Sequence, residues 1–180
     1  FWTFDTMTFN RYSGQRGEHY TVEEGTGQNK RTVTRTRWWP VSGSFQRFFD
    51  DVMVCAANGV PRELLVALEP WPMQKCLPFN QQVIAGFLAQ TYALPLDDGF
   101  REAKTRVESA IDSDVRGRIG GDEQRVSSIH TRYDAIAYKH LLLPVWLMAY
   151  RFHEKTYRVV VNASTGEVQG ERPYSWVKIT

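Results

Sequence analysis

The side chains best suited to chemistry in this sequence form a run of cations and indoles between residues 30 and 39. The run holds four basic residues, two tryptophans and no acidic residue: Lys30, Arg31, Arg35, Arg37, Trp38 and Trp39. On a strand, basic groups about 7 Å apart could follow the phosphates of a nucleic acid while the indoles stack on its bases. The alternative, which we favour, is structural, because Glu18, Glu23 and Glu24 precede the run at a spacing suited to cross-strand ion pairs.

Other kinds of chemistry find little support in the spacing of the residues. The sequence has no GxxxxGK[ST] phosphate loop, and its Gly-Thr-Gly at residues 25–27 lacks the third glycine and the helix of a dinucleotide fingerprint. The four histidines form no HxH, HExxH or Cys/His cluster that would bind a metal. Asp112 and Asp114 stand two positions apart on an expected helix and so face different directions. We therefore expect a non-enzymatic chain with no catalytic residues, no nucleotide and no cofactor of its own.

The composition is that of an ordinary globular chain. Its 180 residues suffice for one domain or two small ones. Formal charge is +2, from 22 basic and 20 acidic residues, so there is no overall signature of polyanion binding. The best apolar run, residues 141–150, is much shorter than the roughly 18 residues of a membrane-spanning helix. Two cysteines are too few for a disulfide framework, and we expect a reducing, cytoplasmic compartment.

Helical spacing predicts one long amphipathic helix over residues 97–119. Its apolar positions repeat every three or four residues, at Phe100, Ala103, Val107, Ala110, Ile111, Val115 and Ile119. The glycine pair at 120–121 is expected to end it. The opposite face carries charges of both signs, as a solvated helix face does.

Most of the remaining sequence has the alternation and turn residues of antiparallel strands. The predicted strands cover residues 1–12, 18–24, 30–39, 125–138, 145–152, 155–162 and 167–170. Residues 25–29 are expected to form a hairpin loop, and residues 45–56 favour a strand over a helix. The predicted fold class is α+β and antiparallel β-rich, with the long helix followed by a meander and packed on one face of an antiparallel sheet.

Four prolines suggest how the chain is organised. They fall within residues 70–96, which we expect to connect an N-terminal β-rich part, residues 1–69, to a C-terminal helix plus β-meander, residues 97–180. Before the connection, Pro61 and three leucines predict a short helix over residues 61–68. The alternative is one continuous domain.

Several strings in the sequence are distinctive enough to suggest a family. They are YKHLLLPVW at 138–146, YR at 150–151, VN at 161–162, TGEV at 165–168, GERPYSW at 170–176, YSGQRGEHY at 12–20, TRWWPVSG at 36–43 and GGDEQ at 120–124. Together they resemble a bacterial family of uncharacterised zinc-ribbon proteins, often labelled primosomal protein N-prime (replication factor Y), superfamily II helicase. The turn at residues 161–168 also resembles, more weakly, the hairpin of PepSY-type modules, which implies binding and not catalysis.

The resemblance implies two segments outside this sequence. A zinc ribbon would precede Phe1, so zinc is expected only there, and a hydrophobic segment would follow residues 176–179. The family member would then be held at the inner face of the cell membrane. The helicase label is not expected to describe this chain, because the chain lacks the nucleotide motifs of a motor and is too short for two motor lobes.

The expected function is therefore a protein-interaction or scaffold domain of a membrane-anchored protein, with an unidentified protein partner. The residues expected to bind that partner are Tyr138, Lys139, His140, Glu171, Arg172 and Tyr174. The alternative is a DNA-binding accessory domain of a replication-associated protein that uses Arg31, Arg35, Arg37, Trp38 and Trp39. Exposed tryptophans with unpaired arginines would favour DNA, whereas arginines paired with glutamates would favour a structural role.

Overall fold

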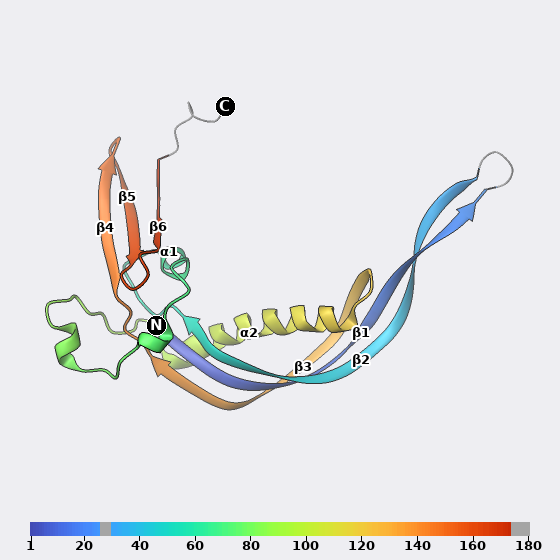
Figure 1. Ribbon diagram of the computed structural model, residues 1–180, viewed down its shortest axis with the longest axis horizontal. Coiled ribbons are helices and arrows are strands. Elements are labelled where there is room, and N and C mark those ends of the chain that lie inside the picture. The colour runs from blue at the N-terminus through green and yellow to red at the C-terminus, as the bar shows by residue number, and fades with distance from the viewer. Residues whose placement is uncertain (26–29, 174–180) are drawn as a thin grey trace. The chain divides into compact units, whose positions relative to one another are not determined.

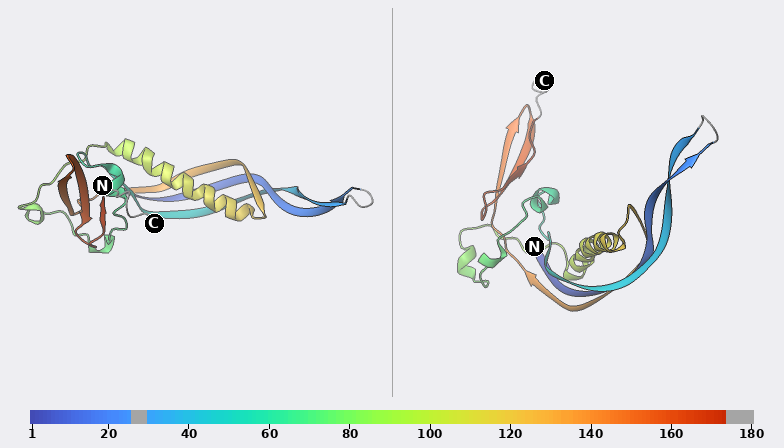
Figure 2. Two further views of the ribbon diagram at one scale, coloured as in Figure 1. Left: turned by 90° about the horizontal axis from the view of Figure 1, so that it is seen from above. Right: turned by 45° about the vertical axis from the view of Figure 1, so that its right-hand side comes forward.

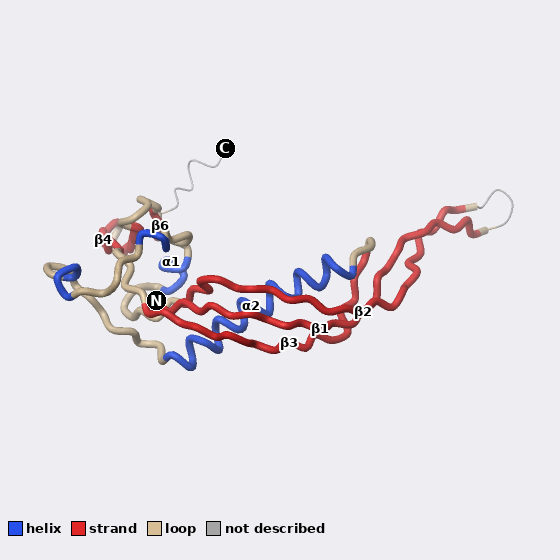
Figure 3. Tube along the Cα trace, turned by 60° about the horizontal axis from the view of Figure 1, so that its bottom comes forward, coloured by secondary structure: helices blue, strands red, loops and turns tan. Residues whose placement is uncertain are grey.

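Residues 1–25 and 30–173 are described by the computed structural model. Its elements are β1 (Trp2–Glu24), β2 (Arg31–Val54), α1 (Arg62–Val66), the 3-10 helices η2 (Met73–Lys75) and η3 (Gln81–Ile84), α2 (Leu96–Ile119), β3 (Glu123–His140), β4 (Val145–Phe152), β5 (Lys155–Asn162) and β6 (Val168–Gly170). The strands form two antiparallel sheets, ordered β2-β1-β3 and β4-β5-β6 (Figures 1 and 3). The predicted α+β, antiparallel β-rich class with one long helix is confirmed. In the described part of the chain, no helix is long and apolar enough to cross a membrane.

The chain forms two compact units, each built from segments that are distant in the sequence. The helix unit consists of Thr3–Met53 and Phe100–Lys139, and the meander unit of Phe1–Trp2, Val54–Gly99 and the chain from His140 onward. These limits cut across the division into 1–69, 70–96 and 97–180 that we expected. The physical reason is that β3, which follows α2, pairs with β1, so that the N-terminal strands and residues 100–139 share one sheet.

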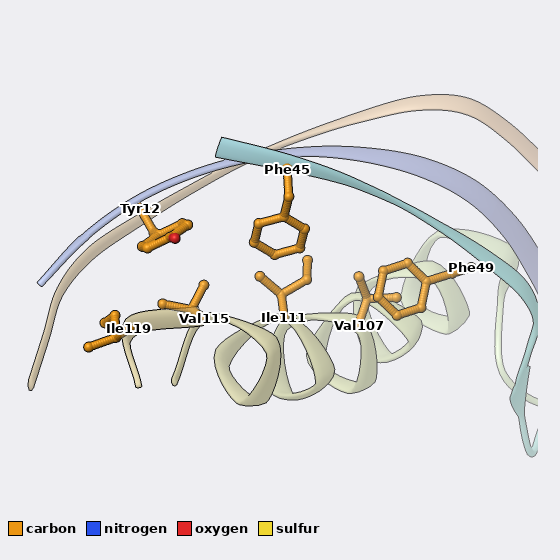
Figure 4. Close-up of a cluster of buried hydrophobic side chains, with 7 residues drawn as sticks. All are labelled: Tyr12, Phe45, Phe49, Val107, Ile111, Val115 and Ile119. Atoms are coloured by element: carbon orange, nitrogen blue, oxygen red, sulfur yellow. The ribbon is translucent and has the colours of Figure 1, made fainter. Parts of the chain in front are cut away.

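Helix α2 packs on the sheet of the helix unit, as its apolar spacing requires. The buried cluster between them consists of Tyr12, Phe45, Phe49, Val107, Ile111, Val115 and Ile119 (Figure 4). The three strands curve around the helix (Figure 1), and an ion pair of 2.7 Å between Arg47 Nη1 and Asp114 Oδ2 links β2 to α2. The predicted packing of the long helix on one face of an antiparallel sheet is confirmed, and β4, β5 and β6 form a separate sheet.

Strand β1 lies between β2 and β3 and carries buried polar side chains. Thr6, Thr8 and Asn10 alternate along β1 and are almost fully buried. Thr8 Oγ1 donates a hydrogen bond of 2.9 Å to the carbonyl of Arg47 on β2, and Asn10 Oδ1 accepts one of 2.8 Å from Thr131 Oγ1 on β3. Buried polar groups are tolerated when they are bonded in this way, so this stripe ties the central strand to both of its neighbours.

The β1–β2 hairpin extends past the start of β3 as a two-stranded ribbon (Figure 2). The amide of Asp122, directly before β3, donates to the carbonyl of Gly17 at 2.9 Å. Gly17 also lies against an indole, since a Cβ at this position would stand 2.9 Å from Trp38 Cζ3. The ribbon confirms the predicted strands at 18–24 and 30–39 except for Lys30, and residues 26–29 of the predicted loop lie outside the described residues.

The meander unit contains the predicted hairpin with its predicted bounds. β4 pairs with β5 from Val145 opposite Asn162 to Phe152 opposite Lys155. His153 and Glu154 connect them, with φ of 45° and 62°, as in the two-residue turns that suit antiparallel hairpins. β6 adds to the other edge of β5. The register decides which side chains share a face of this sheet.

Candidate functional site

The β4–β5–β6 sheet has one face made almost entirely of aromatic and aliphatic side chains. The register pairs Trp146 with Val161 and Met148 with Val159, and residues directly opposite one another project from the same face. We call this surface the aromatic face, and its members are Trp146, Met148, Tyr150, Phe152, Tyr157, Val159, Val161 and Val168. Lys155 lies at the hairpin end of the same face, where its Nζ is 5.3 Å from the centre of the Tyr157 ring.

The aromatic face is exposed, whereas part of the opposite face is buried. Trp146 is 60% exposed, and Met148 and Val168 are also more than half exposed. On the opposite face, Val160 and Asn162 are buried. Contiguous apolar surface of this kind marks an interaction site when it is larger than the scattered apolar residues of an ordinary surface.

Asn162 fixes the orientation of the sheet within the meander unit. Its Nδ2 donates 3.2 Å to the carbonyl of Leu68, just after α1, and its Oδ1 accepts from the amides of Ser164 and Thr165 at 2.9 and 3.2 Å. The face that carries Asn162 is therefore turned toward the α1 segment, and the aromatic face is turned away from it.

Two tyrosines of the aromatic face are already ordered. The rings of Tyr150 and Tyr157 stack with centres 5.3 Å apart and an interplanar angle of 16°. Tyr150 Oη donates 3.3 Å to the carbonyl of Glu171, whose amide donates 2.9 Å to the carbonyl of Arg158. Rings held in place before binding lose less conformational freedom when a partner covers them.

The residues predicted to bind a partner are divided between the two units. Tyr138 and Lys139 belong to the helix unit, and His140 belongs to the meander unit. Glu171 borders the aromatic face through its bond to Tyr150, and Arg172 follows it as an exposed residue. Tyr174 lies outside the described residues.

Lys139 is held by two carboxylates in the helix unit. Its Nζ lies 3.0 Å from Asp51 Oδ1 and 3.2 Å from Asp5 Oδ2. These hydrogen bonds, to Asp51 first and then to Asp5, raise the pKa of Lys139 above its ordinary value. Asp50 completes an acidic cluster whose carboxylate oxygens lie within 4.8 Å of one another. The ammonium of Lys139 already supplies a countercharge there, which weakens the case for a metal ion.

His140 packs among aromatic rings of the meander unit. Its ring centre is 4.6 Å from that of Trp2 and 5.3 Å from that of Tyr92. Partial burial disfavours the charged imidazolium and lowers the pKa of His140 below its ordinary value. Its contacts are thus structural, although its ring remains partly exposed.

We expect the pKa of His140 to make the protein less stable in mild acid. The folded-state pKa lies below the unfolded one, so stability is full above the unfolded pKa and falls as the pH drops toward the folded pKa. An NMR titration of the His140 ring should give a midpoint below that of a free histidine. In His140→Gln, the thermal midpoint should depend less on pH over the same window. A midpoint above the free value would contradict this expectation.

The residues of the DNA-binding alternative have mixed environments. Arg35 pairs with Glu24, and Arg37 lies over the ring of Tyr20 at 5.0 Å. Trp38 is half-buried beneath the guanidinium of Arg125. These contacts agree with the structural interpretation of the run. Arg31 and Trp39 are exposed, so DNA binding stays an untested prediction.

The sequence contains a weak signal for the aromatic face. Residues 145–150 are continuously apolar, and Tyr157, Val159 and Val161 alternate with Arg158 and Val160, which predicts a strand pair in which one face of the second strand is fully apolar. Alternation does not reveal whether such a face is covered, and in a typical sheet it would form the core. Exposure of the face is therefore a finding of the structure.

Comparison with known proteins adds a distant relative. No family model matches the chain, and no solved structure matches it. The chain is similar to "Uncharacterized protein YdjG" of Bacillus subtilis (strain 168), with 26% identity over 182 residues that include 99% of this chain and 52% of the relative. The chain thus spans about half the length of the curated relative that it matches.

Proposed function

We propose that this chain is a non-enzymatic interaction domain whose aromatic face packs against the same face of a second copy. The observation that carries the proposal is a set of eight apolar residues on one sheet face, five of which are exposed: Trp146, Met148, Tyr150, Phe152 and Val168. Trp, Tyr, Phe and Met are the residue types enriched at the centres of protein interfaces. A pair of identical faces would form a closed, two-fold symmetric contact.

The composition of the face favours a permanent partner over a transient one. Interfaces of permanent homodimers resemble a domain core cut in half, whereas transient interfaces are about as polar as the rest of the surface. Two sheet faces pack well about 10 Å apart, with their side chains interdigitated. Half-exposed aromatic residues of roughly 150–250 Å² each give this patch an area on the order of several hundred Å², which approaches the roughly 800 Å² per partner of a standard interface.

A pair of adjacent substitutions tests the proposal. Trp146 and Leu147 are neighbours on β4, are exposed to almost the same extent, and point to opposite faces of the sheet. In light scattering after size exclusion, the unmodified chain should have about twice its mass of 20.8 kDa. Trp146→Glu should shift it to the monomer mass because a charge would be buried in the contact, and Leu147→Glu should leave the dimer intact.

Two results would contradict self-association through this face. The first is a monomer mass for the unmodified chain at the highest attainable concentration. The second is an equal effect of Trp146→Glu and Leu147→Glu. Circular dichroism of each variant should match the unmodified chain, because both side chains are exposed and their loss removes no buried contact.

We also propose that the domain belongs to a longer zinc-ribbon protein at the inner face of the cell membrane. The support is the resemblance of its sequence strings to that family and the length of YdjG, about half of which lies outside the match. Zinc would then be bound by cysteines outside this chain. Metal analysis of the longer protein, compared with this chain alone, tests the assignment.

A further inference from the structure

The connection between η2 and α2 in the meander unit has an unusual composition. Residues 76–96 are 21 consecutive positions without Asp, Glu, Lys, Arg or His. At the 23% charged residues of the whole chain, about five charges would be expected over such a length. An exposed connection is normally rich in charge, so this stretch calls for a physical reason.

The apolar side chains of this connection are turned outward. Leu88 is fully exposed, Leu77 is 78% exposed and Phe87 is 69% exposed. We call residues 77–88 the apolar loop, and its exposed large apolar members are Leu77, Phe79, Val83, Phe87 and Leu88. Figure 1 shows it in green as a loop around η3. None of these five side chains belongs to the aromatic face.

The connection is fastened to its own unit while its apolar side chains stay exposed. The amide of Ala93 donates 2.7 Å to the carbonyl of Ala56, and Trp2 Nε1 donates 2.9 Å to the carbonyl of Leu94. Within the loop, the amide of Phe87 donates 3.1 Å to the carbonyl of Ile84. Gly86 has a φ of 83° there, as the third residue of a type II turn requires. Phe87 and Leu88 therefore follow directly from a tight turn.

We propose that the apolar loop inserts into the interfacial region of a lipid bilayer. Phe87 and Leu88 project where the chain leaves a tight turn, and fluid acyl chains can surround such exposed side chains without a matching shape. No charge has to be removed from water, which is the costly part of entering a bilayer. Asn80, Gln81 and Gln82 can remain hydrated at headgroup level. Lys75, which directly precedes the uncharged stretch, is placed to meet anionic headgroups.

Vesicle flotation tests the proposal with the whole chain. The probes are vesicles of phosphatidylcholine and vesicles of equimolar phosphatidylcholine and phosphatidylglycerol. The unmodified chain should float with both kinds of vesicle. The affinity of the double variant Phe87→Ser, Leu88→Ser for the vesicles should be lower by a factor of about ten or more. The matched control is Phe48→Ser, Ile136→Ser, which removes two exposed apolar side chains from the helix unit and should bind like the unmodified chain.

A probe at the tip of the apolar loop shows whether this segment enters the bilayer. Cys55 is buried and Cys76 is exposed, so Leu88→Cys in a Cys76→Ser background gives one accessible site for a polarity-sensitive dye. Its emission should shift to the blue when vesicles are added and stay unchanged with soluble proteins. Absence of flotation, equal loss of binding in the control, or a dye that stays in water would each overturn the proposal. None of these results depends on self-association through the aromatic face.

Discussion

Replacing Ile111 with alanine is expected to lower the free energy of unfolding of the helix unit by about 2–5 kcal/mol. Ile111 is buried at the middle of the apolar stripe of α2 and belongs to the cluster with Phe45 and Phe49 from β2 (Figure 4). The loss combines the transfer free energy of the removed methyl and methylene groups with the cavity they leave. That cavity cannot close easily, because curved strands and a long helix enclose it.

Denaturant unfolding followed by circular dichroism at the helix band measures this loss, since α2 is the long helix of the described chain. The matched control is Ser113→Ala, two positions away on the exposed face of α2, which should change stability by less than about 0.5 kcal/mol. If both variants unfolded at the same denaturant concentration, α2 would not be packed on this sheet.

Helix α2 could be predicted from the sequence because its signal is local. Apolar residues recur every three or four positions, and Gly120 follows as a helix stop. The structure places the end at Ile119 and buries Val107, Ile111 and Val115 as predicted. The β4–β5 hairpin was predictable for the same reason, since its strands are neighbours joined by two residues.

The combination of strands into sheets could not be predicted, because it depends on contacts between distant residues. The local sequence of residues 123–140 does not indicate that this strand pairs with β1 and not with β4. The buried stripe of Thr6, Thr8 and Asn10 looks like ordinary strand sequence until the partners from β2 and β3 are known. The contacts of Lys139 with Asp5 and Asp51 likewise join residues more than eighty positions apart.

The candidate site shows the same limit in a different form. The apolar character of β4 is visible in the sequence at Trp146 and Met148, but burial depends on which face meets α1. Asn162 decides this, because its bond to the Leu68 carbonyl turns its own face inward. The residues predicted from distinctive strings, such as Lys139 and His140, prove to be engaged within their own units. The distinctive strings therefore include residues of both kinds, since Trp146 and Tyr150 of the aromatic face also lie within them.

Asn162→Ala is expected to destabilise the meander unit by about 2–4 kcal/mol. The side chain is fully buried, and truncation removes the side-chain partner of the Leu68 carbonyl and of the Ser164 amide. A buried polar group left without a partner costs about 1–3 kcal/mol. Polar groups of the exposed turn at residues 163–166 can bond to water instead, which limits the total loss of stability. The substitution also releases the contact that orients the sheet on α1.

Amide hydrogen exchange together with denaturant unfolding measures this effect. Exchange at Ser164 should accelerate in Asn162→Ala, because the acceptor of its amide is gone, whereas the amide of Thr165 keeps the backbone carbonyl of residue 162 as an acceptor at 3.3 Å. Asn80→Ala is the matched control, since Asn80 Oδ1 also accepts from an amide two residues ahead, at 3.0 Å, but in an exposed turn. It should cost less than about 1 kcal/mol, because water can replace the lost bond. Equal losses in the two variants would mean that Asn162 acts only as a turn residue, and the orientation of the aromatic face would then need another cause.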